Sequence, residues 1–192
     1  MRSYFVKVNF GTTLIFVKPS ILKPLLFFLF FPVVPINADE SKEPKIAIYF
    51  SPNGGCTNAI VSSLDAAQTS ILVQAYSFTS APIAKALVNA KNRGVDVQVI
   101  LDKSQKTEKY TSATFLFNAG VPTFIDGKHK IAHNKIMILD GRTVITGSFN
   151  FTKSAEESNA ENLLVIDAPE LAKKYSENWK NHLLHSEPYS RP

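Results

Sequence analysis

The chain has 192 residues, of which 45% are hydrophobic and 19% are charged, as is typical of a globular protein with one domain. The formal net charge is +5, but four of the 21 basic residues and none of the 16 acidic ones precede Asp39. The remainder therefore carries only +1, so overall basicity does not indicate nucleic-acid binding, and the single cysteine, Cys56, excludes an intrachain disulfide bond.

Residues 1–38 have the order of a secretory signal peptide. Four basic residues precede an apolar run at 25–34, and Ala38 then offers a small residue before Asp39 and Glu40. The apolar run is shorter than the ~20 residues that span a membrane. We therefore expect cleavage after Ala38 and export of a domain at 39–192 to the periplasm or beyond. The unusually long basic region leaves an uncleaved membrane anchor as the less favoured alternative.

The first half of this domain alternates predicted strands and helices. Strand patterns occupy 45–51, 70–76 and 95–101, and helical spacing of apolar residues occupies 57–68 and the segment from Pro82 to Gly94. Strand–helix–strand repeats imply right-handed crossovers and parallel strands. The polar, basic loop at 103–111 follows the end of a buried strand, where α/β sheets tend to bind ligands. We therefore expect Lys103 to bind substrate.

The second half contains a predicted hairpin. Apolar runs on either side of Asp140-Gly141 predict two antiparallel strands joined by a tight turn. The other predicted elements are a helix at 108–118, strands at 121–125 and 162–166, and a closing helix at 170–184. Together the elements predict a single α/β domain, with a mixed, mainly parallel β-sheet flanked by helices on both faces.

The hairpin carries the residues that indicate chemistry. His133 and Lys135 are two residues apart in a run of strand-forming residues, so both side chains leave the same face. The turn brings Ser148 and Asn150 back towards the same end of the sheet. An imidazole nucleophile, a fixed cation and small hydrogen-bonding groups together suit an attack on phosphorus.

The spacing His-x-Lys-x-x-x-x-Asp at 133–140, followed by Gly-Ser-x-Asn at 147–150, resembles the signature of the phospholipase D superfamily. The segments that resemble its small bacterial endonucleases are Tyr76-Ser77-Phe78-Thr79, Arg93-Gly94-Val95-Asp96-Val97 and Asn159-Ala160-Glu161-Asn162. The resemblance spans about 45–179 and implies the phospholipase D/nuclease fold. It also points to Glu161 as the carboxylate that orients His133.

We expect neutral His133 to attack phosphorus and form a phosphohistidine, which water later cleaves. Glu161 would fix the tautomer of His133, and Asp140 would support either Lys135 or the hairpin geometry. Superfamily enzymes typically combine two such motifs, one histidine attacking and the other protonating the leaving oxygen. Because this chain contains one motif, the resemblance implies a homodimer with a shared active site.

The sequence predicts neither a metal ion nor a cofactor. It shows no carboxylate cluster suited to magnesium and no Cys/His set with zinc spacing, so activity should persist in a chelator. His182 and His185 are three apart on the closing helix without an evident third ligand, and we expect solvated surface there. His129 is assigned to a basic rim, since eight basic residues face four acidic ones between Asp102 and Lys153.

Three functions remain open. The first is a metal-independent, largely sequence-nonspecific endonuclease acting on DNA, with RNA as a further candidate substrate. The second is a phospholipase D that hydrolyses phospholipid head groups, and the third is a non-catalytic nucleic-acid-binding module. The intact set of His133, Lys135 and Asp140 argues against the third. The compact domain and the basic loop beside the site favour nucleic acid over lipid.

Overall fold

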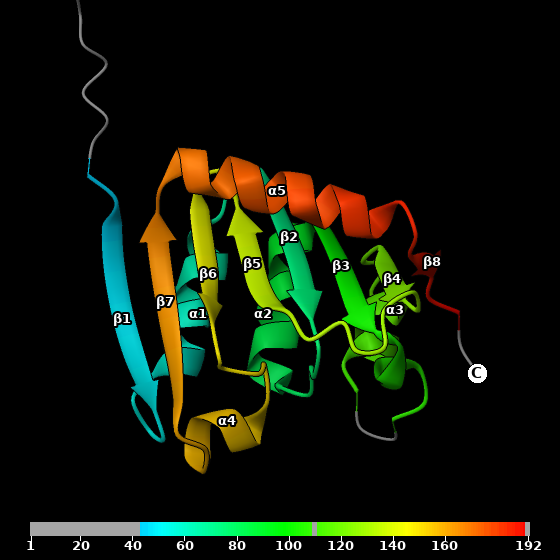
Figure 1. Cartoon of the computed structure of the whole chain (residues 1–192), viewed down its shortest axis with the longest axis horizontal. Helices are drawn as coiled ribbons and strands as arrows, with labels where there is room; N and C mark the ends of the chain where they lie inside the picture. Colours follow the sequence, from blue (N-terminus) through cyan, green and yellow to red (C-terminus); the bar gives the residue numbers. More distant parts are fainter. Residues whose placement is uncertain (1–42, 109–110, 191–192) are drawn as a thin grey trace, which may run out of the picture. The chain divides into compact units, whose positions relative to one another are not determined.

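The structure of the chain is a computed structural model that describes residues 43–108 and 111–190, in which the strands form one sheet in the order β1-β7-β6-β5-β2-β3-β4-β8 (Figure 1). The strands are β1 (Lys45–Ser51), β2 (Ser70–Ala75), β3 (Asp96–Asp102), β4 (Thr123–Asp126), β5 (Lys135–Leu139), β6 (Thr143–Gly147), β7 (Glu161–Asp167) and β8 (Glu187–Pro188). The helices are α1 (Cys56–Ala66), α2 (Ala81–Asn92), α3 (Ala113–Asn118), α4 (Lys153–Glu157) and α5 (Pro169–Leu183), with a 3₁₀ helix η1 (Lys103–Lys106).

The predicted signal peptide at 1–38 lies outside the described residues. Within the described part of the chain, no helix combines the length and the apolar character that a membrane crossing requires.

The sheet is mixed, as predicted, but it is mostly antiparallel rather than mainly parallel. Parallel pairing joins β2 to β3 and β3 to β4, whereas the other neighbouring strands pair antiparallel. The prediction that β1 and β2 run in the same direction is correct, but β7, β6 and β5 lie between them. The hairpin β5–β6 and the returning strand β7 enter the sheet as antiparallel neighbours, which the strand–helix alternation did not reveal.

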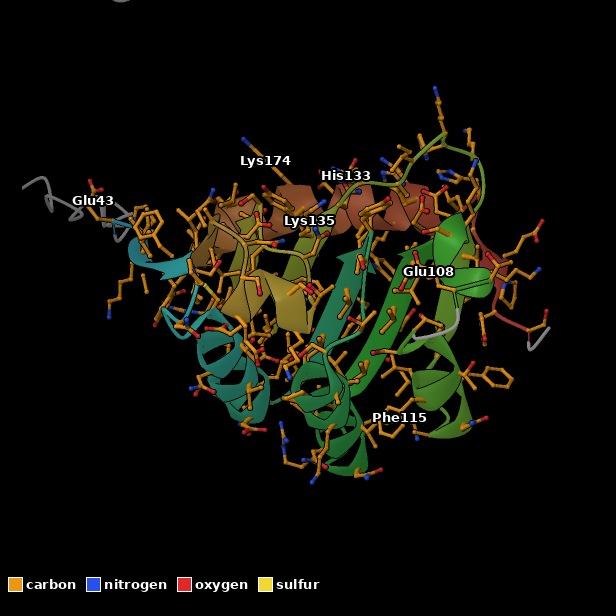
Figure 2. All side chains as sticks on the ribbon, turned by 90° about the horizontal axis from the view of Figure 1, so that it is seen from below. Glu43, Glu108, Phe115, His133, Lys135 and Lys174 are labelled. Carbon is orange, nitrogen blue, oxygen red and sulfur yellow. The ribbon has the colours of Figure 1, made fainter. Side chains whose placement is uncertain are left out.

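Helices cover both faces of the sheet, as predicted (Figure 2). On one face, Leu64 of α1 and Leu87 of α2 are fully buried in the larger hydrophobic core. On the other face, Trp179 of α5 packs against Ile138 of β5 in a second core. The indole Nε1 of Trp179 donates to the backbone oxygen of Val73 at 2.9 Å. This bond positions α5 across the middle of the sheet because it satisfies the one polar group of a buried indole.

The helix predicted at 108–118 is shorter than expected and begins at Ala113. Residues 109–110 lie outside the described part of the chain, and before them Gln105 of η1 has a fully buried side chain. The Gln105 amide oxygen accepts from Phe78 N at 3.1 Å and from Thr111 Oγ1 at 3.1 Å, while its Nε2 donates to Glu108 at 2.8 Å. These tertiary bonds replace the helical turn that local spacing favoured.

Helix α4 is an element that the sequence did not predict. Its Glu156 carboxylate accepts hydrogen bonds from Gly55 N at 3.0 Å and Thr57 N at 2.6 Å. These are free donors at the start of α1, so a carboxylate from a distant element supplies the cap. The bonds hold the loop after β6 against α1.

Candidate active site

Strand register brings the predicted catalytic residues to one end of the sheet. Lys135 begins β5 and lies opposite the last residue of β2. Ser148 directly follows β6, and its backbone N–H donates to Asn162 O of β7 at 3.1 Å. Glu161 begins β7 at the same end. Figure 2 views the molecule from below Figure 1 and shows His133 and Lys135 near one another.

Lys135 is a nearly buried cation, with 8% of its surface exposed. Its Nζ donates to the backbone oxygen of His133 at 3.0 Å and lies 5.1 Å from the centre of the Tyr76 ring. Burial lowers the pKa of Lys135 below the ordinary 10.5, and the nearby Glu161 carboxylate opposes this shift. A cation in such a poorly solvated position attracts a phosphate more strongly than one on the open surface.

His133 is exposed and therefore accessible to a substrate. Its ring lies against Tyr76, with ring centroids 4.5 Å apart and planes inclined by 54°. The backbone N–H of Tyr76 donates to Asn134 O at 2.8 Å, which fixes the tyrosine beside the segment that carries His133. Tyr76 belongs to a segment that carries the family resemblance, but it was not predicted as a site residue. Its position at the end of a buried strand was the available signal for a site residue.

Ser148 is oriented by β7. Its Oγ accepts hydrogen bonds from Asn162 N at 3.1 Å and Asn162 Nδ2 at 3.3 Å, so its own O–H remains to donate. Gly147 before it has φ 151°, and a Cβ there would overlap the backbone oxygen of Asn162. Asn150 Oδ1 is buried and has no hydrogen-bond partner within the described residues. Both predicted phosphate-binding side chains therefore retain hydrogen-bonding capacity.

Glu161 lies near Lys135 rather than on the ring of His133. Its Oε1 accepts from Asn159 Nδ2 at 3.1 Å, and its backbone N–H donates to Ser51 Oγ at 3.2 Å. Between 43 and 190, apart from the undescribed 109–110, no hydrogen bond joins Glu161 to His133. The orienting role of Glu161 therefore stays a prediction, and its effect in the structure is electrostatic and falls on Lys135.

Asp140 lies at the opposite end of β5, which places it ~16 Å along the strand from Lys135. Its carboxylate accepts hydrogen bonds from the backbone N–H groups of Gln68, Thr69 and Ser70, at distances of 2.7–3.2 Å. Although burial alone would raise the pKa of Asp140, these bonds hold it below its usual 3.8. Of the two roles expected for Asp140, its contacts fit support of the hairpin geometry rather than a contact with Lys135, and a part in catalysis stays a prediction.

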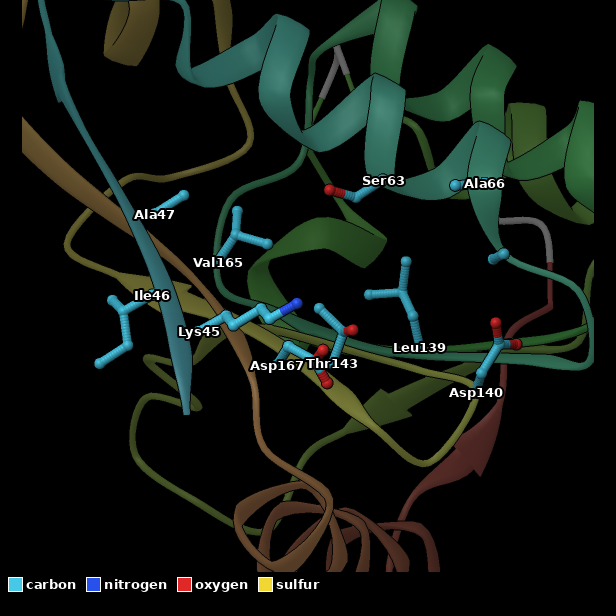
Figure 3. A pocket seen from close by; sticks show the side chains of 11 residues that line it. Lys45, Ile46, Ala47, Ser63, Ala66, Leu139, Asp140, Thr143, Val165 and Asp167 are labelled. Carbon is cyan, nitrogen blue, oxygen red and sulfur yellow. The ribbon is translucent and has the colours of Figure 1, made fainter. Parts of the chain in front are cut away.

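A pocket of about 470 Å³ lies beside Asp140, among β1, α1 and the β5–β6 hairpin (Figure 3). Lys45, Ser63 and Asp167 also line it. Because it lies at the Asp140 end of the sheet, this pocket is separate from the phosphate site expected at His133. The exposed His133 lies instead at the opposite end of the sheet, where β5 begins.

Lys103, the third predicted substrate-binding residue, contacts the segment that leads to His133. Its Nζ donates to the backbone oxygen of His129 at 3.0 Å. The side chain is exposed at the end of β3, on the same end of the sheet as Lys135. Contact between Lys103 and a substrate remains a prediction.

The prediction that His182 and His185 lie on a solvated surface is wrong. Their side chains are only 16% and 22% exposed, and with His129 they surround the fully buried carboxylate of Asp126. Burial would raise the pKa of Asp126, but the hydrogen bonds of His182 and His129 and the neighbouring ring of His185 lower it to about 2. Of the residues that the structure describes, these four are the group placed to hold a metal ion.

Comparisons with known proteins show the family to which the chain belongs. A family described as "Cardiolipin synthase, PLD-like domain" matches residues 60–183. A protein named phospholipase D from Rickettsia conorii is 43% identical over 145 residues, which are 76% of this chain and 72% of that protein. Nuc from Salmonella typhimurium, a phospholipase D family member of known structure, is 41% identical with a TM-score of 0.74, over 78% of this chain and 100% of Nuc. NucT from Helicobacter pylori is 27% identical with a TM-score of 0.70, over 77% of this chain and 100% of NucT.

The fold, the His133–Lys135 site and these matches establish that the chain belongs to the phospholipase D superfamily and is a phosphodiesterase of that family. Within the superfamily it is similar to Nuc and NucT, the small members with one motif per chain. The superfamily and the fold type predicted from the motif spacing are thus confirmed.

Proposed function

We propose that the protein is an endonuclease that cleaves the phosphodiester bonds of nucleic acid without a metal ion at the reacting phosphate. The observation that carries this proposal is the exposed His133 beside the buried, cationic Lys135 at one end of the sheet.

In the first step, a neutral ring nitrogen of His133 attacks phosphorus, and the bond from phosphorus to the leaving oxygen breaks. Lys135 and the Ser148 hydroxyl stabilise the negative charge on the phosphoryl oxygens. In the second step, water attacks the phosphohistidine and releases the phosphate product and free His133. Tyr76 confines the imidazole on one side, so its orientation is restricted before the substrate arrives.

The leaving oxygen needs a proton, and the chain offers no second imidazole for the task. The chain has four histidines, and the three other than His133 converge on Asp126. We therefore propose a homodimer in which the partner subunit's His133 protonates the leaving oxygen. The same group then accepts a proton from the attacking water.

Basic side chains at this end of the sheet support nucleic acid as the substrate. The loop at 127–134 carries the exposed residues Lys128 and Lys130, and Lys103 lies beside it. This loop crosses from β4 to β5, which is three strand spacings or ~14 Å. A nucleic-acid strand rises ~3.4 Å per phosphate, so basic side chains spread over this distance can contact several phosphates in succession.

Phospholipid is the second candidate substrate. The side chain of Ile131, directly after Lys130 in the loop, is 51% exposed, and an apolar group there can contact an acyl chain. The Rickettsia conorii relative also carries the name phospholipase D. The hydrolysis of either ester would use the same His133 and Lys135.

A substrate panel in excess EDTA distinguishes these substrates. We expect plasmid DNA to be nicked and degraded in EDTA, while vesicles of phosphatidylcholine release little choline. Replacing Lys128 and Lys130 with Gln should lower kcat/KM on DNA by about tenfold and reduce the salt-dependence slope by about 2. The matched control replaces Lys173 and Lys174 on α5, of which Figure 2 labels Lys174, and should change neither quantity. Choline release without DNA or RNA cleavage, with loss of that release in Ile131→Ser, would reverse the ranking.

We further propose that residues 1–38 direct export. A cleaved signal peptide should leave a mature protein that begins at Asp39 in the periplasm or the medium. N-terminal sequencing of the fractionated protein tests this, and an intact leader in the membrane fraction would instead indicate an anchor.

A further inference from the structure

A cluster of three histidines and one aspartate lies outside the reaction site. Asp126 is the last residue of β4, and His129 follows it in the loop at 127–134. His182 lies in the last turn of α5, and His185 comes just after this helix. The end of β4, the loop after it and the end of α5 thus converge on the buried carboxylate of Asp126.

The cluster has the dimensions of a tetrahedral metal site. Asp126 Oδ2 lies 2.8 Å from His182 Nδ1, 3.1 Å from His129 Nδ1 and 3.4 Å from His185 Nε2. One potential ligand atom from each residue lies within 4.8 Å of all the others. Zinc bound by nitrogen and oxygen at ~2.1 Å separates its ligand atoms by ~3.4 Å. Small side-chain rotations, above all of the half-exposed His129, therefore suffice to close the site.

The donor set suits zinc in a structural role. Imidazole nitrogens and a carboxylate are ordinary zinc ligands, and four protein ligands leave no open position for a substrate. His185 Nε2 adds a second observation, because this atom is buried and makes no hydrogen bond within the described residues. Coordination would give this nitrogen the partner that a buried polar atom requires.

We propose that Asp126, His129, His182 and His185 bind one zinc ion that fastens the loop at 127–134 to β4 and α5. The loop leads to the nucleophile, since His133 is four residues beyond His129. It is also held by the bond from Ala132 N to Asp102 Oδ2 at 2.7 Å. The zinc lies about three strand spacings, or ~14 Å, from Lys135, so it stabilises the loop and takes no part in phosphoryl transfer.

Zinc binding to the full chain tests the proposal. The protein is purified without a histidine tag, and a chelator first removes any bound metal. Calorimetry and elemental analysis should find one zinc per chain. Zinc at about 100 times its Kd should raise the Tm by about 5–10 °C. His185→Ala removes a ligand and should weaken zinc binding by more than about 100-fold, with His185→Gln as a second variant that keeps the side-chain bulk. His133→Ala is the matched control and should bind zinc as the wild type does.

Two results would overturn the zinc site: no stoichiometric zinc on the wild-type chain, or unchanged zinc affinity in both folded His185 variants. The test is separate from that of the nuclease proposal. His185→Ala should cleave DNA within about threefold of the wild-type rate at room temperature, because Ala132 and Asn134 still anchor the loop near His133. His133→Ala should show the reverse pattern, with zinc bound and cleavage lost.

Discussion

Lys135 combines two properties that a bare motif does not reveal. It is nearly buried, and it lies between a tyrosine ring and a carboxylate. Burial lowers its pKa, while Glu161 raises it, so Glu161 helps to keep the ammonium charged. The phosphate site thus depends on a cation whose protonation is set by its surroundings.

Affinity for inorganic phosphate at alkaline pH should report the charge of Lys135, because this ammonium is the cation expected to bind the phosphate. We expect the affinity to fall as pH rises, with a midpoint below 10.5, since the pKa of Lys135 is lowered. Glu161→Gln removes the carboxylate that raises this pKa and should move the midpoint to lower pH. Calorimetric titration across this pH range measures it. An unchanged midpoint in Glu161→Gln would show that Glu161 does not act on Lys135.

Residue-level prediction succeeded where the determinants are local. The Asp-Gly turn placed Lys135 and Ser148 at the same end of the sheet from sequence alone. His133 was predicted on the same strand as Lys135, but it lies in the loop just before β5. The cluster around Asp126 was missed because its partners come from β4, a loop and the end of α5. The spacing Asp-x-x-His at 126–129, paired with His-x-x-His at 182–185, was the available signal.

At the scale of elements, the β5–β6 hairpin supports the site from its far end. Its turn residues Asp140 and Gly141 have φ of 53° and 60°, as a two-residue hairpin turn requires. The Asp140 carboxylate then binds three successive backbone N–H groups where β2 begins. The motif aspartate therefore fixes the register of β5 against β2, and with it the position of Lys135 opposite the end of β2.

Asp140→Asn should lower the free energy of unfolding by about 1–2 kcal/mol at neutral pH, because the amide is a weaker acceptor than the carboxylate. The pKa of Asp140 is lowered in the folded state, so its contribution is complete above its unfolded pKa and is lost as pH falls through the folded value. The difference from wild type should therefore shrink below pH 3.8. Urea unfolding across this pH range measures it.

The exposed carboxylate of Asp65 provides the control, and Asp65→Asn should leave stability nearly unchanged. Asp140→Asn should also retain kcat within about threefold once folded, since the residue does not touch the reacting groups. A loss of kcat by a factor of about 1,000 in the folded variant would show that Asp140 takes part in catalysis.

The elements themselves were predicted with unequal success. Strand β1 and the strand–helix units through β3 follow from local apolar spacing, and their boundaries agree closely with the sequence. The neighbouring strand of β1 cannot be predicted from local spacing, because its pairing with β7 joins residues more than a hundred positions apart. The late start of α3 likewise depends on Gln105 bonding to distant backbone groups.

At the scale of the whole molecule, the account requires two subunits per active site. Three of the four histidines belong to the Asp126 cluster, so a single chain holds one imidazole for the two roles of nucleophile and general acid. Two such imidazoles in a shared site would titrate as a coupled pair and give a bell-shaped rate profile.

Mixing subunits tests this requirement. With about a tenfold excess of His133→Ala chains, most wild-type chains enter heterodimers, and activity per wild-type chain should fall about tenfold. The same excess of Asp65→Asn chains is the control and should cause no loss. Constant activity per wild-type chain would show that one subunit completes the reaction alone.

The central claim is that His133 becomes covalently bonded to phosphorus, and trapping the intermediate tests it most directly. The reaction with phosphodiester substrate would be quenched in alkali during turnover, and the protein would be digested for mass spectrometry. The account predicts a phosphoryl adduct on His133 in the wild-type protein and none in His133→Ala. Rapid turnover with no adduct on His133, or an adduct on another residue, would contradict it.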